Sequence, residues 1–370
     1  MSLETKKRKL LSEYEESLRK KVSVNEREDS LLNSFRNFSP ILADEYFRAV
    51  ETEKIFVGKV IVKKDTSRLI KEFSRIWPLE GKSHLKRVRW TPQKDVFEIL
   101  IRPVAEDELI ADCEVYSLEK VIGNADINAS GLMDCVIVRE IPKYPASTYN
   151  QYKESMKFWP VQFREDKYTE QILNDKLFTS EEKKEMELLM KMCISAAKYG
   201  DIKVGCIIVD PSSSKIIAIA HDCRNLHPMQ HAIMVAIDLV ARSQGGGSWN
   251  IDSEHVYHLP FSKEEAEKNI AELKSLNPGK DIKKMSLPYL CTGYDLYVTR
   301  EPCIMCAMAL VHSRIRRVFY GCRTPWGALG SHCKLHLQTS LNHHYEVWSG
   351  LLENHCIDLL KVEPDKRKCS

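Results

Sequence analysis

Two short stretches decide how this 370-residue chain folds: His231-Ala232-Ile233 and, further on, Pro302-Cys303-Ile304-Met305-Cys306. Each begins an apolar segment with helical periodicity, and each follows a short apolar segment typical of a buried strand. Cysteines three residues apart in the first turn of a helix face the same way, and the helix dipole favours their thiolate forms. One histidine nitrogen and two thiolates leave a tetrahedral zinc ion with one open position, as in catalytic sites. We therefore predict that His231, Cys303 and Cys306 bind Zn²⁺.

The proton-transferring residue that such a site needs is missing. Zinc-dependent nucleobase deaminases carry H-x-E before P-C-x-x-C, and the glutamate moves protons without binding the metal. Ile233 stands in the glutamate position, and loss of a general acid/base typically slows a reaction by about 10²–10⁴-fold. Glu301 is expected to point off the site, and Asp238 lies two helical turns past His231. The sequence therefore predicts a chain that has no catalytic residue and no activity of its own.

A zinc ion held for structure usually has four protein ligands. The C-terminal segment offers His355, Cys356 and Cys369, and we consider Cys369 the possible fourth ligand. The N-terminus is charged and lacks the apolar core of a secretory signal, so the twelve cysteines are expected to be reduced thiols.

The pattern around these motifs predicts an α/β domain over residues 166–370. A capping box at Thr179-Ser180-Glu181-Glu182 begins a helix, and short apolar strands alternate with the two ligand-bearing helices. This order predicts a three-layer α/β/α domain with a mixed sheet. Residues from about 245 to 288 fit no period and are interpreted as a surface insertion.

A second pattern covers residues 51–145, where strand, helix, two strands, probable helix and strand follow one another. That order is typical of a split βαβ, ferredoxin-like α+β domain. Residues 1–50 are charged and are expected to be partly helical or disordered. Residues 146–165 are expected to be a linker, because prolines punctuate them.

Basic residues gather in the predicted α+β domain. Between Lys54 and Arg102 there are 13 Lys or Arg against 5 Asp or Glu, a local charge of +8, whereas the whole chain carries only +3. A concentrated basic field attracts polyanions, so we predict salt-dependent contacts with RNA phosphates. A solvated basic surface over an ordinary core is the alternative. The predicted RNA-binding residues are Lys59, Lys63, Lys64, Arg68, Lys71, Arg75, Lys82, Lys86, Arg87, Arg89 and Lys94.

Several segments together resemble a known family. They are similar to the tRNA-specific adenosine deaminases of the cytidine-deaminase superfamily, and in particular to the inert subunit of the eukaryotic enzymes that convert the wobble adenosine of tRNA to inosine. That subunit likewise has an apolar residue in the glutamate position. The matching segments are residues 204–209 (VGCIIV), 231–236 (HAIMVA), 290–297 (LCTGYDLY), 299–315 (TREPCIMCAMALVHSRI), 318–321 (VFYG) and 341–347 (LNHHYEV).

The resemblance implies that His231, Cys303 and Cys306 are the zinc ligands. It also implies a heterodimer with a catalytic adenosine deaminase subunit. The RNA that the chain binds would be the anticodon arm of tRNA. An active deaminase with a displaced acid/base and an RNA-binding scaffold are the alternatives. No apolar run is long enough to span a membrane. We expect the protein in the nucleus and the cytoplasm, with the basic run from Lys6 to Lys9 as either a nuclear signal or a solvated tail.

Overall fold

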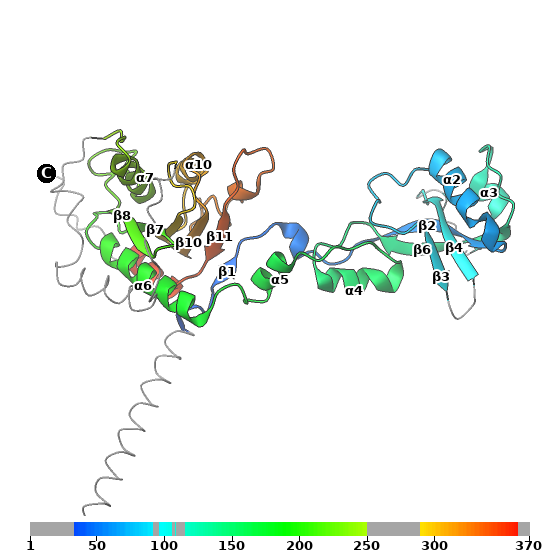
Figure 1. Ribbon diagram of the computed structural model, residues 1–370, viewed down its shortest axis with the longest axis horizontal. Helices are drawn as coiled ribbons and strands as arrows, with labels where there is room; N and C mark the ends of the chain where they lie inside the picture. The colour runs from blue at the N-terminus through cyan, green and yellow to red at the C-terminus, as the bar shows by residue number, and fades with distance from the viewer. Residues whose placement is uncertain (1–32, 92–95, 106–107, 109–114, 250–288, 362–370) are drawn as a thin grey trace, which may run out of the picture. The chain divides into compact units, whose positions relative to one another are not determined.

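The computed structural model describes residues 33–91, 96–105, 108, 115–249 and 289–361. These residues form two compact units (Figure 1). The first combines the segment up to Ala43 with the chain from Asp175 onward and is called the deaminase unit after the family that its sequence resembles. The second, the ferredoxin-like unit, is Asp44–Asn174. The domain boundaries were expected at residues 50, 145 and 165, whereas the two units meet after Ala43 and after Asn174. Within the described residues, no helix is both long and apolar enough to cross a bilayer.

A mixed six-stranded sheet is the centre of the deaminase unit, as predicted. Its strand order is β1-β11-β10-β9-β7-β8. Strands β9, β10 and β11 are parallel neighbours, whereas β7 is antiparallel to both β8 and β9. The strands are β1 (Ser39–Pro40), β7 (Gly205–Asp210), β8 (Lys215–His221), β9 (Asp295–Arg300), β10 (Arg317–Cys322) and β11 (Glu346–Ser349).

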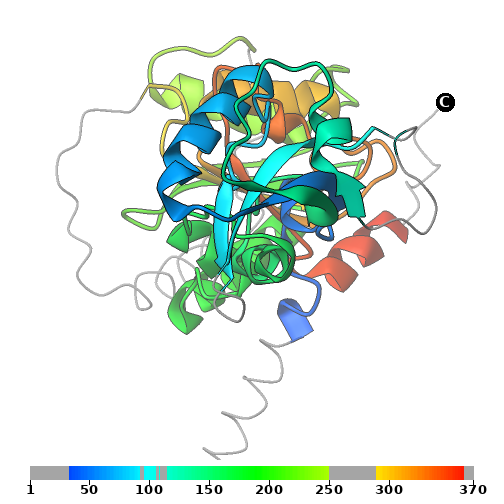
Figure 2. The same cartoon turned by 90° about the vertical axis from the view of Figure 1, so that its right-hand side faces the viewer.

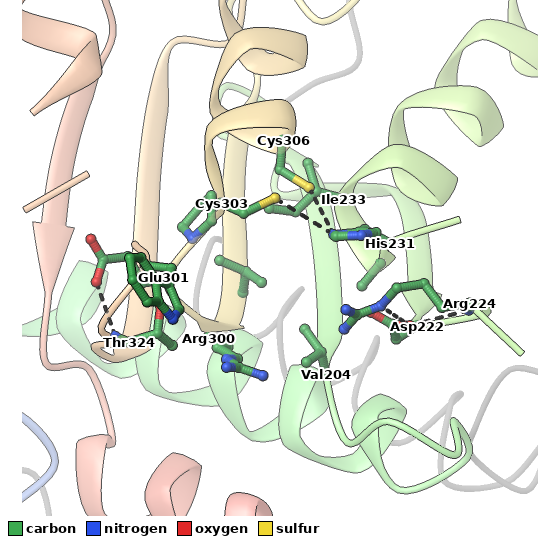
Figure 3. A pocket seen from close by; sticks show the side chains of 14 residues that line it. Val204, Asp222, Arg224, His231, Ile233, Arg300, Glu301, Cys303, Cys306 and Thr324 are labelled. Atoms are coloured by element: carbon green, nitrogen blue, oxygen red, sulfur yellow. Dashed lines mark hydrogen bonds and ion pairs between the residues drawn. The ribbon is translucent and has the colours of Figure 1, made fainter. Parts of the chain in front are cut away.

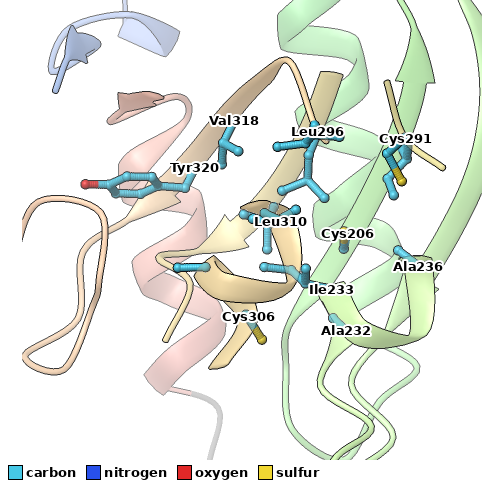
Figure 4. Packing of buried hydrophobic residues seen from close by; sticks show 14 of the residues in the cluster. Cys206, Ala232, Ile233, Ala236, Cys291, Leu296, Cys306, Leu310, Val318 and Tyr320 are labelled. Atoms are coloured by element: carbon cyan, nitrogen blue, oxygen red, sulfur yellow. The ribbon is translucent and has the colours of Figure 1, made fainter. Parts of the chain in front are cut away.

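Helices cover both faces of this sheet and make the three layers (Figure 1). Helix α6 (Ser180–Ala197) begins with the predicted capping box, since Thr179 and Glu182 accept each other's backbone N–H. It shares one face with α11 (Glu353–Lys361), and α7 (Ala232–Ser243) and α10 (Ile304–His312) pack on the other. Because side chains alternate along a strand, Leu296 and Val298 of β9 join the core under α7 and α10 (Figure 4).

The ferredoxin-like unit is a five-stranded antiparallel sheet with the order β3-β4-β2-β6-β5. The first four strands in this order have the arrangement of a split βαβ fold, as predicted. Helices α2 and α3 cover one face, and α4 lies against β6 (Figures 1 and 2). The elements are β2 (Thr52–Val60), α2 (Thr66–Ile76), β3 (Val88–Thr91), β4 (Val96–Pro103), β5 (Val115–Ser117), α3 (Leu118–Ile122), β6 (Leu132–Pro142), α4 (Tyr149–Phe158) and α5 (Lys167–Leu173).

The flanking segments differ in part from the expectations. The expected linker at 146–165 contains α4, which has its own capping box at Thr148 and Gln151. Its buried residues are polar, Gln151 and Ser155, so no apolar stripe marks it in the sequence. The described part of the N-terminal segment is ordered on the deaminase unit, where Ser39 of β1 pairs with Ser349 of β11. Residues 250–288 of the insertion predicted at about 245–288 lie outside the described residues.

Candidate metal centre

The three predicted zinc ligands lie together at the starts of two helices (Figure 3). His231 is the N-cap of α7, Cys303 is the N-cap of α10, and Cys306 lies in the first turn of α10. The Nδ1 atom of His231 is 3.7 Å from Sγ of Cys303 and 3.6 Å from Sγ of Cys306. Tetrahedral zinc with Zn–S of about 2.3 Å and Zn–N of about 2.0 Å requires nitrogen–sulfur distances of about 3.6 Å. The donor set and its spacing therefore fit a zinc ion.

The two thiols influence each other's ionisation. The hydrogen bond from Cys306 lowers the pKa of the Cys303 thiol to about 5. The same contact, together with burial, raises the pKa of Cys306. The pair therefore favours the thiolate form of Cys303, which is the form that binds a metal ion.

A cavity of about 120 Å³ opens beside these ligands. Ile233 lies on its wall and is only 3% exposed, because its side chain also belongs to the core between the sheet and the helices (Figure 4). An apolar side chain thus lies on the cavity wall two residues after His231.

Three carboxylates lie near the cavity or its helices, and each has other partners. Glu301 lines the cavity, but its oxygens accept hydrogen bonds from the backbone N–H groups of residues 324, 329 and 331 and from the Ser331 hydroxyl. Asp238 binds Arg242 and the backbone N–H of residue 248. Asp222, which the sequence did not single out, is buried in the cavity wall, and both its oxygens accept from Arg224. None is free to replace the missing glutamate.

The candidate fourth ligands do not join the site within the described chain. His355 is exposed on α11, and Cys356 is buried beside Gly321. Among the described residues that offer metal ligands, the group comprises His231, Cys303 and Cys306 only. Cys369 lies outside the described residues.

The four arginines predicted to bind RNA make contacts within the ferredoxin-like unit. Arg87 donates to the backbone carbonyls of residues 73, 77, 100 and 101, and burial lowers its pKa to about 10. Arg89 pairs with the buried Glu98 and stacks over the Trp159 ring. Arg68 and Arg75 donate to carbonyls between residues 126 and 130.

RNA binding by these arginines stays a prediction, but their contacts show a role within the unit. A planar guanidinium suits several carbonyl oxygens at once, so these arginines stabilise the fold. Lys82 is likewise paired with Glu53. Lys94 lies outside the described residues, and Lys59 is half-buried. The exposed members of the set are Lys63, Lys64, Lys71, Arg75 and Lys86.

Comparison with known proteins agrees with the fold and the site. A family model described as the cytidine and deoxycytidylate deaminase zinc-binding region matches residues 179–322. A second model, the tRNA-specific adenosine deaminase TAD3 N-terminal domain, matches residues 54–159. The deaminase unit is therefore a cytidine-deaminase-like zinc-binding domain, and the ferredoxin-like unit corresponds to the TAD3 N-terminal domain.

The relatives define the family more closely. The chain is 42% identical over 330 residues to a probable inactive tRNA-specific adenosine deaminase-like protein 3 from Danio rerio, covering 87% of this chain and 94% of the relative. It is 28% identical to the tRNA-specific adenosine deaminase subunit TAD3 of Saccharomyces cerevisiae, over 74% of this chain and 76% of that one. The chain belongs to this family of tRNA-specific adenosine deaminase-like proteins 3.

A solved structure from a study of tRNA:A34 deaminases at the wobble position matches at 24% identity. It covers 46% of this chain and 96% of that one, with a TM-score of 0.32. This likeness concerns the fold and carries no argument about function.

Proposed function

We propose that this chain is the non-catalytic subunit of a heterodimeric tRNA adenosine-34 deaminase, which makes inosine at the wobble position. One observation carries the proposal: a complete set of zinc ligands stands beside Ile233, where the glutamate should be. The three nearby carboxylates are all bound elsewhere. Such a site could hold a metal ion but could not transfer a proton. This combination fits a subunit that keeps the deaminase fold in order to assemble with a catalytic subunit.

His231, Cys303 and Cys306 would hold the zinc ion. In an active deaminase such an ion activates the water that attacks the base. Here the same three residues would tie the N-terminal ends of α7 and α10 together, which is a structural role.

The partner would be a catalytic adenosine deaminase subunit with an intact glutamate. Relatives from two yeasts are named subunits of a tRNA-specific adenosine deaminase, which supports a shared assembly for this chain. The ferredoxin-like unit would bind the anticodon arm and present it to that subunit. We expect the assembly in both nucleus and cytoplasm, and imaging of a tagged chain in intact and Lys6–Lys9-substituted forms tests this.

Purified chain, catalytic subunit and their mixture should differ sharply in inosine formation on a wobble-adenosine tRNA. We expect no inosine from this chain alone, because no described carboxylate is free beside the metal ligands. We expect full activity only from the mixture. Activity of this chain alone would support a displaced acid/base, and no effect on the partner would support an unrelated RNA-binding scaffold.

Exposed lysines of the ferredoxin-like unit should supply part of the RNA affinity. Lys64 and Lys71 are exposed along α2 and the turn before it. We expect Lys64→Glu/Lys71→Glu to weaken tRNA binding roughly tenfold at low salt and to lower the salt dependence, since phosphate contacts release counterions. Binding titrations across a salt series measure both effects.

A charge-matched control uses the deaminase unit. Lys176 and Lys184 are also exposed and lie outside the predicted set, so Lys176→Glu/Lys184→Glu changes the net charge equally. Equal losses in the two double variants would show that total charge, and not this lysine surface, determines the affinity.

A further inference from the structure

One loop at the mouth of the metal-site cavity is held unusually firmly. It follows β10 and spans residues 324–331, and the buried Glu301 carboxylate binds the backbone N–H groups of residues 324, 329 and 331. The loop lies so close that a Cβ atom at Gly327 would overlap this carboxylate. The Glu301 carboxylate therefore holds the backbone of the loop in place.

This fixed loop presents an exposed tryptophan. Trp326 lines the cavity, yet its side chain is 75% exposed, and its nearest ring neighbour is His332 at 5.8 Å. Exposing an indole to water is unfavourable, and a rigid support lowers the entropy lost when the ring binds a partner. The exposure and the rigid support of Trp326 therefore suit a residue that contacts a binding partner.

The charged residues around Trp326 indicate the chemical class of the binding partner. Arg224 and Arg300 also line the cavity, and they reach it from different elements (Figure 3). The backbone of Arg300 pairs with β10, but across the described chain its guanidinium has no hydrogen bond and no ion pair. Both carboxylates on the cavity wall, Asp222 and Glu301, are already occupied. An aromatic face beside an unpaired guanidinium suits an unstacked base with its phosphate.

We propose that Trp326 and Arg300 form a contact site for single-stranded RNA at the mouth of the inert cavity. A base of the anticodon loop stacks on the indole, and Arg300 binds a neighbouring phosphate. This proposal rests on the proposed function, because it assigns to the inert site a share of tRNA presentation. It adds an RNA contact on the deaminase unit to the lysines proposed on the ferredoxin-like unit.

The test measures binding of an anticodon stem-loop RNA to the complex of full-length chain and catalytic subunit. We expect Trp326→Ala to weaken binding roughly tenfold, within the range supplied by one stacked base, and Trp326→Phe to keep most of the affinity. Arg300→Gln should lower the slope of log affinity against log salt by about one.

The matched control is Tyr289→Ala. Tyr289 is 74% exposed, and it lies next to Leu290, which contacts Gln244 at the C-terminal end of α7, the end opposite His231. It should leave RNA affinity unchanged. Photo-crosslinking of a thiouridine-substituted loop should give adducts in the peptide that contains residues 324–331.

The outcomes separate two failures. Unchanged RNA affinity in Trp326→Ala overturns the contact site while leaving the proposed function intact. Loss of association with the catalytic subunit, at unchanged RNA affinity, also overturns it and assigns Trp326 to a protein interface. No RNA binding by the unsubstituted complex would overturn the proposed function as well.

Discussion

Cys303→Ala is expected to abolish stoichiometric zinc binding and to unfold the deaminase unit. The substitution leaves His231 and Cys306 as the only described ligands, and these residues lie at the starts of two different helices. Structural zinc contributes about 10–16 kcal/mol in small domains, whereas a whole domain is stable by about 5–15 kcal/mol. The loss is therefore comparable to the entire stability. Metal content per chain and thermal unfolding measure it.

Cys333→Ala is the matched control for this experiment. Cys333 is also half-buried, and its thiol donates to the backbone carbonyl of residue 328, but it is no part of the metal group. We expect this variant to keep one zinc ion per chain and to unfold close to the unsubstituted protein. A Cys303→Ala chain with full zinc content and an unchanged melting temperature would refute the ligand assignment.

The metal centre was predictable from the sequence because its geometry is local. Two cysteines in one helical turn must face the same way, and the apolar periodicity marks where each helix begins. The structure brings His231 to this pair as expected. Asp222 was missed because it lies in a loop, where no periodicity places it beside the cavity. Its pairing with Arg224 is visible only in the fold.

The predicted RNA-binding set shows what a count of charges cannot distinguish. The sequence gives Arg87 and Lys64 the same charge and similar surroundings, yet one is surrounded by backbone carbonyls and the other is exposed. Which carbonyls remain unpaired depends on how α2 and β4 pack, and that is a tertiary property. Helix α4 was missed for a related reason, since polar side chains form its buried contacts.

Glu301→Ala should strongly destabilise the deaminase unit. It removes the acceptor for three backbone N–H groups, two of them buried, and leaves a cavity next to Gly327. Each buried donor left unpaired costs about 1–3 kcal/mol. We therefore expect a loss of roughly 3 kcal/mol or more, measured by urea unfolding. Native-state hydrogen exchange should show lost protection at the amides of residues 324 and 329.

Glu182→Ala is the control carboxylate for this loop. Glu182 is exposed and accepts from a single backbone N–H at the start of α6, so its removal should cost about 1 kcal/mol. If Glu301 also fixes Trp326 for RNA, Glu301→Ala should weaken RNA binding under conditions in which the chain is still folded. Glu182→Ala should not. Unchanged amide protection in Glu301→Ala would show that the loop is ordered without its carboxylate, and the rigid presentation of Trp326 would need another cause.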